Sequence, residues 1–229
     1  MRIGIIGAGN IGGTLARRLT ALGHQVSIAN SRGPQTLGAL AKDTGAKPVT
    51  VQEAAHEGEV VIVTIPEKSI PQLAAGLFEG VNADVVVVDT GNYYPQQRDG
   101  RIEAIETGTT ESRWVSNQLR RPVVKAFNNI YARHLLDKGK PKGTRGRIAL
   151  PVAGDDQRAK DVVMRLVDQL GFDPVDAGGL DDSWRQQPDT PVYGTDHDAA
   201  GVRRALAEAK RERPVAFRAA AGKSTKGSA

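Results

Sequence analysis

Apolar residues of the chain occur in short continuous runs that alternate with sets at helical spacing. Residues 2–6 form the first run, and an isoleucine and three leucines then recur at helical spacing within residues 11–22. The runs at 60–66 and 85–89 are apolar at nearly every position, which is typical of strands buried on both faces of a parallel sheet. This alternation predicts an α/β protein with a doubly wound parallel sheet.

The same two patterns place the other elements, and glycines mark several helix ends. Strands are predicted at residues 2–6, 25–29, 47–50, 60–66, 85–89, 123–127, 148–153 and 174–176. Helices are predicted at residues 11–22, 36–44, 52–56, 69–78, 130–136 and 157–170. The polar, turn-rich stretch 91–108 follows a buried strand, so we expect it to line the crevice in which doubly wound proteins bind ligands.

Composition and charge remove several classes of function. The net charge of +5 would suit a nucleic-acid partner, but eight of the Lys and Arg residues and only two Glu residues follow residue 202. The excess charge therefore belongs to a terminal helix and tail, and no nucleic-acid partner is expected. No stretch approaches the ~20 apolar residues of a membrane helix, and no secretory signal is visible. Without cysteine there is no disulfide or thiolate chemistry, and the expected location is cytoplasmic, with no membrane partner.

A glycine pattern directly follows the first predicted strand and opens the first predicted helix. Gly7-Ala8-Gly9-Asn10-Ile11-Gly12 has the G-x-G-x-x-G spacing of a dinucleotide-binding loop. The first glycine permits a tight turn, the second lets the backbone approach a pyrophosphate, and the third lets the helix pack closely on the strand. The free N–H groups at the start of the helix would face the phosphates.

The end of the second predicted strand selects between NAD and NADP. An NAD site places Asp or Glu there for the ribose hydroxyls, whereas this chain has Asn30-Ser31-Arg32 and no acidic residue before Asp43. Arg32 can pair with a ribose 2′-phosphate, and Ser31 can donate its hydroxyl to the same group. The sequence therefore predicts NADP(H), against the alternative that Arg32 is only a surface residue in a turn.

These features predict a Rossmann-type doubly wound sheet with a smaller C-terminal α/β extension. Residues 1–130 are predicted to form the NADP-binding domain. Residues 131–214 are predicted to form the extension, which would supply an acceptor site or a dimer contact. Residues 215–229 are predicted to be a disordered basic tail, because small and charged residues dominate its end.

Six short motifs occur in a fixed order along residues 1–180. They are Gly7-Ala8-Gly9-Asn10-Ile11-Gly12, Asn30-Ser31-Arg32, Thr64-Ile65-Pro66, Lys125-Ala126-Phe127-Asn128, Val152-Ala153-Gly154-Asp155-Asp156 and Asp176-Ala177-Gly178. In this order they resemble the NADPH:deazaflavin (coenzyme F-420) oxidoreductase family, which also resembles the cytoplasmic domain of the membrane metalloreductases. The resemblance implies hydride transfer between NADPH and a flavin or deazaflavin.

The resemblance also assigns site residues. It implies that Thr64, Ile65 and Pro66 line the adenosine and pyrophosphate side of the cofactor. Residues nearer the nicotinamide would be Asn92, Lys125, Ala126 and Asn128. For Lys125 and Asn128 a structural role, in which they tie down strand ends, is an equal alternative.

The segment 182–193 departs from the family pattern. It is polar, interrupted by proline and aromatic, where deazaflavin enzymes of the family have an apolar helix at the acceptor site. We expect it to be a substrate loop, a lid or a subunit contact, in which Trp184 and Tyr193 stack on a ring or pack at an interface. The resemblance implies a homodimer, for which 184–193 is a candidate interface.

The sequence shows no catalytic constellation, and hydride transfer between two flat rings does not require one. The four histidines lack metal-ligand spacing, so no metal site is predicted. We therefore expect an NADP(H)-dependent oxidoreductase that reduces a small-molecule electron acceptor. One alternative is a carbonyl or imine reductase, whose proton donor would be Tyr94, Lys125 or Tyr131. Another is a non-enzymatic NADP(H)-binding redox sensor.

Overall fold

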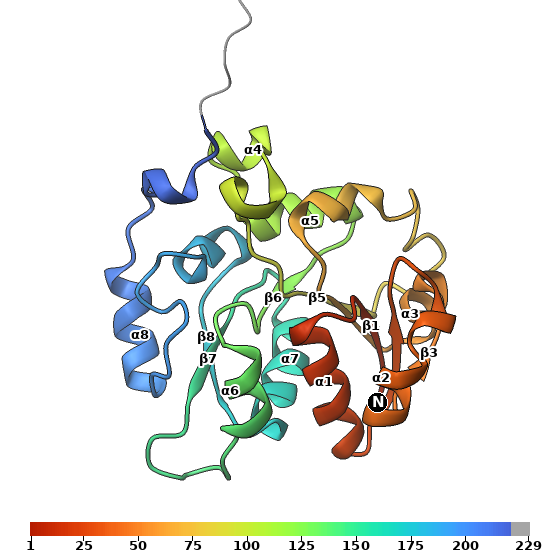
Figure 1. Ribbon diagram of the computed structural model, residues 1–229. Coiled ribbons are helices and arrows are strands. Elements are labelled where there is room, and N and C mark those ends of the chain that lie inside the picture. The colour runs from red at the N-terminus through yellow and green to blue at the C-terminus, as the bar shows by residue number, and fades with distance from the viewer. Residues whose placement is uncertain (221–229) are drawn as a thin grey trace, which may run out of the picture.

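A six-stranded parallel sheet forms the centre of the computed structural model, which describes residues 1–220 (Figure 1). Its strands are β1 (Arg2–Ile6), β2 (Gln25–Ala29), β3 (Lys47–Pro48), β4 (Val60–Val63), β5 (Val86–Asp89) and β6 (Val124–Lys125). Across the sheet they lie in the order β3-β2-β1-β4-β5-β6. This is the strand order of the dinucleotide-binding Rossmann fold, so the predicted fold class is confirmed.

Helices connect the strands and cover both faces of the sheet (Figure 1). The α-helices are α1 (Asn10–Ala21), α2 (Gly38–Thr44), α3 (Val51–Glu57), α4 (Glu103–Glu106), α5 (Glu111–Leu119), α6 (Ala132–Asp137), α7 (Gln157–Gln169) and α8 (Ala199–Glu208). Short turns of other helix types are η1 (Pro34–Thr36), η2 (Glu67–Gln72), η3 (Pro95–Asp99), η4 (Leu180–Gln186) and η5 (Val215–Phe217).

The continuous apolar strands supply two separate cores, because successive strand residues point to opposite faces of a sheet. Ile5 and Ile62 belong to the core beneath α1, α6 and α7. Ile6 and Val63 belong to the core beneath α3 and α5. Burial on both faces explains why these strands lack the alternation of a half-exposed strand.

The C-terminal extension has its own small sheet. Strands β7 (Ala149–Val152) and β8 (Asp173–Asp176) pair in parallel and pack against α8. An isolated antiparallel bridge joins this sheet to β6, because Lys125 and Ala153 exchange backbone hydrogen bonds of 2.8 and 3.0 Å. The predicted strands of the extension are therefore present, in a sheet separate from the main one. The predicted domain boundaries stay predictions.

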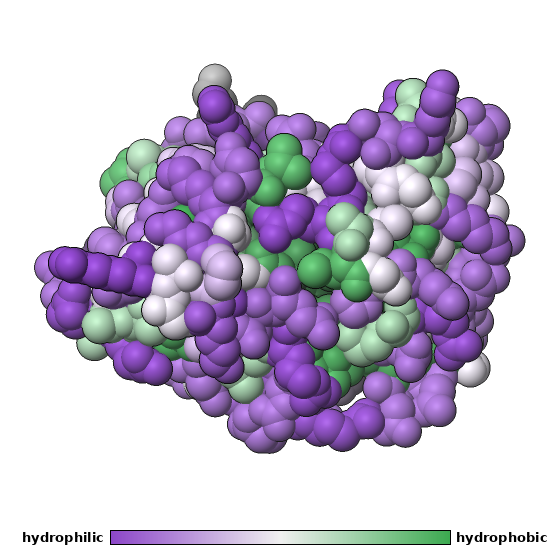
Figure 2. Space-filling view, turned by 90° about the horizontal axis from the view of Figure 1, so that it is seen from below, coloured by the Kyte–Doolittle hydropathy of each residue, from purple (hydrophilic) through white to green (hydrophobic). Residues whose placement is uncertain are grey.

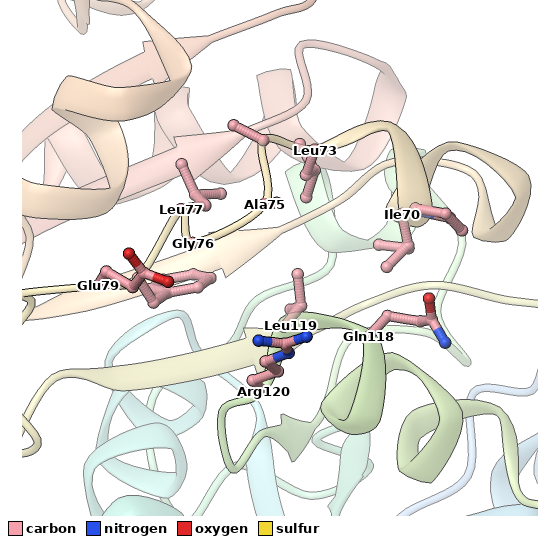
Figure 3. A pocket seen from close by; sticks show the side chains of 12 residues that line it. Ile70, Leu73, Ala75, Gly76, Leu77, Glu79, Gln118, Leu119 and Arg120 are labelled. Carbon is pink, nitrogen blue, oxygen red and sulfur yellow. The ribbon is translucent and has the colours of Figure 1, made fainter.

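The prediction of a helix at residues 69–78 is wrong. Residues 67–72 form only the short turn η2, which contains Pro71, and the chain then turns irregularly with Gly76 at a φ of 78°. Proline lacks the N–H of an α-helical residue and its ring clashes with the preceding turn, so the apolar spacing could not produce a helix here. The irregular segment leaves a cavity of about 270 Å³ against the end of α5 (Figure 3).

Helix α5 was not predicted, and neither were η3 and α4 within the stretch 91–108. The sequence of α5 is mostly polar, but Thr110 caps it by accepting a hydrogen bond from the backbone N–H of Arg113. Trp114 and Leu119 are buried on the sheet. Tertiary packing of these apolar side chains, rather than helical spacing over a long window, stabilises the helix.

The tail predicted to be disordered differs from the structure over residues 215–219. Gln96 donates to the carbonyl oxygens of Val215 and Arg218, at 3.0 and 2.9 Å, and the N–H of Ala219 donates to Glu106. Polar partners on the loop after β5 therefore fix this part of the chain. Residues 221–229, the rest of the predicted tail, lie outside the described residues.

The surface is mainly hydrophilic on the side seen from below in Figure 1, and hydrophobic side chains show chiefly in a depression near its centre (Figure 2). Among the helices of residues 1–220, none is long and apolar enough to cross a membrane.

Candidate active site

The glycine loop brings three pieces of backbone into direct contact. Gly7 adopts a φ of 118°, and a Cβ there would lie 2.2 Å from the carbonyl oxygen of Thr64. A Cβ on Gly12 would lie 2.0 Å from the carbonyl oxygen of Gly7. Any side chain at either position would therefore push β1, α1 and the end of β4 apart. The positive φ of Gly7 agrees with the tight turn predicted for the first glycine, and the contact at Gly12 agrees with the close packing predicted for the third.

Gly9 differs from these two glycines because the space in front of it is open. A Cβ on Gly9 would meet nothing within 4 Å. Gly9 is also the N-cap of α1, so no side chain satisfies the first N–H groups of that helix, and its first turn holds no acidic residue. An open cradle lined by free N–H groups at the positive end of a helix fits a diphosphate. The residues present therefore fit a dinucleotide at this position.

The turn after β2 is ordered by Asn30. Its side-chain oxygen accepts from the N–H of Arg32 at 2.9 Å, and its amide nitrogen donates to the hydroxyl of Thr36 at 2.9 Å. Gln35 donates to the carbonyl oxygen of Arg32 at 2.8 Å. Asn30 thus shapes the turn that presents Ser31 and Arg32.

Arg32 is exposed, and its guanidinium forms no ion pair within the described part of the chain. The acidic residue that comes first in the sequence, Asp43, is already paired with Arg17. Hydrogen bonds fix the backbone of Arg32, and no carboxylate pairs with its guanidinium in the described residues. The guanidinium is therefore available to pair with a phosphate.

Three loops follow β4, β5 and β6 at the carboxyl edge of the sheet, and the loop after β4 is in direct contact with the glycine loop. Thr64, Ile65 and Pro66 follow β4 and are partly exposed, as a contact with a ligand requires. Asn92 follows β5 and is also partly exposed. It is held by Asn128, because each residue donates its side-chain amide to the other at about 3 Å.

The structure places the remaining predicted nicotinamide contacts inside the protein. Lys125 and Ala126 have no exposed surface, and Asn128 has 4%. The amine of Lys125 donates to Asp89 at 3.1 Å and to the carbonyl oxygen of Gly91 at 2.6 Å. Asn128 joins Asn92 to the carbonyl oxygen of Gln186. The structure therefore favours the alternative interpretation, in which Lys125 and Asn128 tie down strand ends.

A group of buried charges lies under the loop that carries Asn92. The carboxylate of Asp89 accepts from Lys125 and, at 2.7 Å, from the hydroxyl of Ser112. Burial works against the charged amine of Lys125, but the carboxylates of Asp89, Glu111 and Glu67 outweigh it and raise the pKa of Lys125. The ion pair of Lys125 and Asp89 is closed to solvent, because the two side chains are 0% and 2% exposed.

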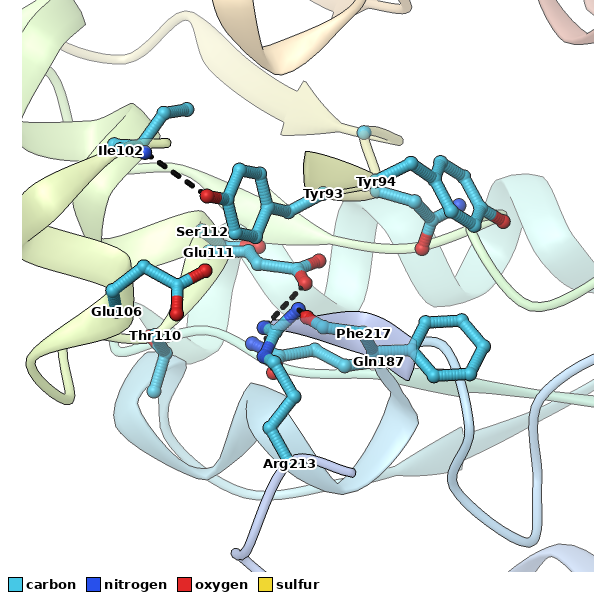
Figure 4. Close-up of polar contacts among 12 residues, drawn as sticks. Tyr93, Tyr94, Ile102, Glu106, Thr110, Glu111, Ser112, Gln187, Arg213 and Phe217 are labelled. Atoms are coloured by element: carbon cyan, nitrogen blue, oxygen red, sulfur yellow. Dashed lines mark hydrogen bonds and ion pairs between the residues drawn. The ribbon is translucent and has the colours of Figure 1, made fainter. Parts of the chain in front are cut away.

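Glu111 and Arg213 form a second buried ion pair, 2.8 Å long, beside the first (Figure 4). Arg213 comes from the segment after α8, and it also donates to the side-chain oxygen of Gln187 at 3.0 Å. Its guanidinium lies 5.2 Å from the ring centroid of Tyr93. Tyr93 itself connects the carbonyl oxygen of Gly100 to the N–H of Ile102. The C-terminal segment thus anchors the loop after β5.

Sequence reasoning missed Glu67, Asp89, Glu111 and Arg213. Asp89 ends an all-valine strand and Lys125 interrupts the apolar strand that pairs with it, so opposite charges in two neighbouring buried strands could have indicated the first ion pair. Glu67, Glu111 and Arg213 come from polar segments in which no local pattern distinguishes a buried charge from an exposed one.

Glu67 is buried, and among residues 1–220 neither of its carboxyl oxygens has a hydrogen-bond partner. Burial, followed by the charge of Asp89, raises its pKa well above the usual 4.5. A raised folded-state pKa stabilises the fold at low pH and loses that contribution as pH rises toward it.

We expect Glu67→Gln to gain stability relative to the wild type as pH rises above 4.5, the usual pKa of a glutamate. The expected slope is about 1.4 kcal/mol per pH unit while folded Glu67 holds its proton. Urea unfolding at several pH values measures it. Glu79→Gln, at an exposed glutamate, is the control and should leave the pH dependence unchanged. Parallel pH profiles for Glu67→Gln and the wild type would contradict the account.

The fold and the glycine loop together define a dinucleotide-binding Rossmann protein. A sequence model of the family described as "NADP oxidoreductase coenzyme F420-dependent" matches residues 2–93. The N-terminal part of the chain is therefore similar to this family. The predicted resemblance is confirmed over these residues, and it supports the predicted class of NADP-dependent oxidoreductase.

Relatives support the assignment over different lengths. Protein YjhV of Escherichia coli (strain K12) is 46% identical over 92 residues, which are 40% of this chain and 60% of that protein. The F420-dependent NADP reductase of Methanothermobacter marburgensis is 28% identical over 84% of this chain and 90% of its own length. The crystal structure of a hypothetical protein from Sinorhizobium meliloti has a TM-score of 0.73 and 32% identity, covering 86% of this chain and 95% of that one.

The relation to metalloreductases is also confirmed. Metalloreductase STEAP3 of Rattus norvegicus is 28% identical over 180 residues, which are 78% of this chain but 34% of that protein. The shared region is therefore a minor part of the longer relative.

Proposed function

We propose that the protein binds NADP(H) and transfers hydride between it and a small-molecule acceptor. The observation that carries the proposal is the open cradle at Gly9, where the uncapped start of α1 faces free space. The unneutralised Arg32 at the end of β2 supports NADP(H) over NAD(H).

Each predicted contact has a separate task in this proposal. The backbone N–H groups from Gly9 to Gly12 hold the pyrophosphate. Arg32 and Ser31 hold the 2′-phosphate, and Asn30 orients them through its hydrogen bonds. Thr64, Ile65 and Pro66 line the adenosine and pyrophosphate side, and Asn92 lies toward the nicotinamide. The bound nucleotide supplies the hydride, so the chain's own work is to bind and orient two rings.

The proposed acceptor is a flavin, a deazaflavin or a related small molecule. The name of the Methanothermobacter relative, similar over most of both chains, supports a deazaflavin. The polar segment 182–193 stands where the deazaflavin enzymes of the family have an apolar helix, so we expect the acceptor site of this chain to differ in shape from theirs. A cytoplasmic homodimer remains our expectation.

The test follows NADPH oxidation by the purified protein with FMN, FAD, a deazaflavin or a ferric chelate offered as acceptor. Turnover with one acceptor supports the reductase proposal and names the acceptor class. Tight NADPH binding without turnover would contradict it, in favour of a carbonyl or imine substrate or a redox sensor.

Gly9→Val is the matched negative control for this test. Its Cβ meets nothing in the protein, so we expect the variant to fold with little change in thermal stability. The added side chain occupies the cradle, so NADPH binding and turnover should fall by at least about tenfold, or about 1.4 kcal/mol. Unchanged NADPH binding to the folded variant would show that the phosphates lie elsewhere.

A further inference from the structure

The hydroxyl groups of Tyr94 and Tyr193 are hydrogen bonded to each other although the residues lie 99 positions apart. Tyr94 belongs to the loop after β5, two residues beyond Asn92. Tyr193 follows η4 in the C-terminal extension, where the N–H of Gly194 donates to the carbonyl oxygen of Asn129 at 2.9 Å. The pair joins the two parts of the chain at the carboxyl edge of the main sheet, where doubly wound proteins bind their ligands.

Tyr94 is held from three sides. Its backbone N–H donates to Asp99 at 2.8 Å, and its hydroxyl meets Tyr193. The guanidinium of Arg98 lies 5.3 Å from the centroid of its ring. Arg98 is itself fixed by two bonds to Asp99 and by one to the carbonyl oxygen of Asn92. Tyr94 therefore has a cation against one face of its ring, in cation–π contact.

The two phenols are not equivalent. Burial, then the hydrogen bond to Tyr94 and the nearby Glu111 and Tyr131, raise the pKa of Tyr193. Either hydroxyl can be the donor in this hydrogen bond. When Tyr193 donates, the hydrogen of the Tyr94 hydroxyl is left for a different acceptor atom. In Figure 4 the side chains of Tyr93 and Tyr94 point in opposite directions. Tyr93 lies against Arg213 of the buried ion pair, and Tyr94 points away from it.

We propose that Tyr94 is the catalytic proton donor of the acceptor site, positioned by Tyr193 and Arg98. The inference rests on the proposed function, and it narrows the acceptor to a molecule whose reduced group contains or is conjugated to a C=N or C=O bond. As a carbon atom gains hydride, the π electrons move to the nitrogen or oxygen, which takes the proton from Tyr94. The phenolate left behind is held by the Tyr193 hydroxyl and Arg98 until water returns a proton.

The other two candidate donors are placed less well. Lys125 has no exposed surface and is committed to Asp89. Tyr131 is 58% exposed, and its ring packs edge-on against His134 with the centroids 5.4 Å apart.

The first test uses no turnover. The chain has four tyrosines, so fluorotyrosine labelling gives four ¹⁹F signals that single Tyr→Phe variants assign. We expect the Tyr94 signal to move when Tyr193 is changed to Phe, and to move again when NADP⁺ is added. The Tyr93 signal should not respond to the nucleotide, because that side chain is fully buried. A Tyr94 signal that ignores both changes while NADP⁺ binds overturns the inference.

The second test measures oxidation of NADPH with 5-deazariboflavin as the probe. Tyr94→Phe should lower kcat by about 100-fold or more and leave the Kd for NADPH within about twofold of the wild-type value. Tyr193→Phe should lower kcat by about tenfold, and Tyr131→Phe should not change it. An active Tyr94→Phe enzyme overturns the inference but leaves the proposed function intact. If the wild type does not bind NADP⁺, both the proposed function and the inference about Tyr94 are contradicted.

Discussion

Lys125→Met is expected to lower the free energy of unfolding by about 3–5 kcal/mol. The amine of Lys125 is the partner of the buried Asp89 carboxylate, 3.1 Å away. Glu67 and Glu111 are also buried nearby and act on the charge of Lys125. Methionine fills a similar volume but leaves the buried carboxylate of Asp89 without its cation, which is the costly way to break a buried pair. Urea unfolding, followed by circular dichroism, measures the loss.

Lys142→Met is the matched control for this prediction. Lys142 also forms an ion pair, with Asp168 at 3.7 Å, but its side chain is 81% exposed. Surface pairs contribute about 0–1 kcal/mol, so the control should unfold close to the wild type. Equal losses for the two variants would mean that burial does not decide the value of the Lys125 pair.

Arg32→Ala is expected to weaken NADPH binding by about 10- to 150-fold, which corresponds to about 1.5–3 kcal/mol for a charge-assisted contact. The affinity for NADH should not change, because NADH lacks the 2′-phosphate. Since the guanidinium forms no ion pair within residues 1–220, its removal should not affect folding. Isothermal titration calorimetry with both nucleotides measures the effect.

Two variants accompany Arg32→Ala. Arg133→Ala removes one positive charge at a residue whose side chain is 87% exposed, and it should leave both affinities unchanged. Arg32→Lys keeps the charge but loses the planar fork, so its effect should be intermediate. Equal weakening of NADPH and NADH in Arg32→Ala would rule out the 2′-phosphate assignment.

The fold was predictable because its strongest features are local. Strands buried on both faces need continuous apolar runs such as 60–63, and the glycine loop needs particular residues at particular positions. Gly7 and Gly12 show the reason directly, since a Cβ at either would meet backbone within 2.2 Å. Such constraints can be derived from one stretch of sequence.

The rest of the site depends on contacts between distant residues. Glu111 and Arg213 are 102 positions apart, and Tyr94 and Tyr193 are 99 apart. Their segments are polar and carry no period that indicates burial. The same limit applied to 69–78, where apolar spacing predicted a helix but Pro71 and the packing against α5 produced an irregular segment. Short motifs therefore predict where the nucleotide binds, but they do not predict the charges that support the loop after β5.

The central claim is that this chain is built for NADP(H) rather than NAD(H), and calorimetric titration of the wild-type protein with NADPH and NADH tests it most directly. We predict that NADPH binds at least about tenfold more tightly, a difference of about 1.4 kcal/mol or more. Equal affinities, or tighter binding of NADH, would contradict the assignment of Arg32 and with it the proposed cofactor.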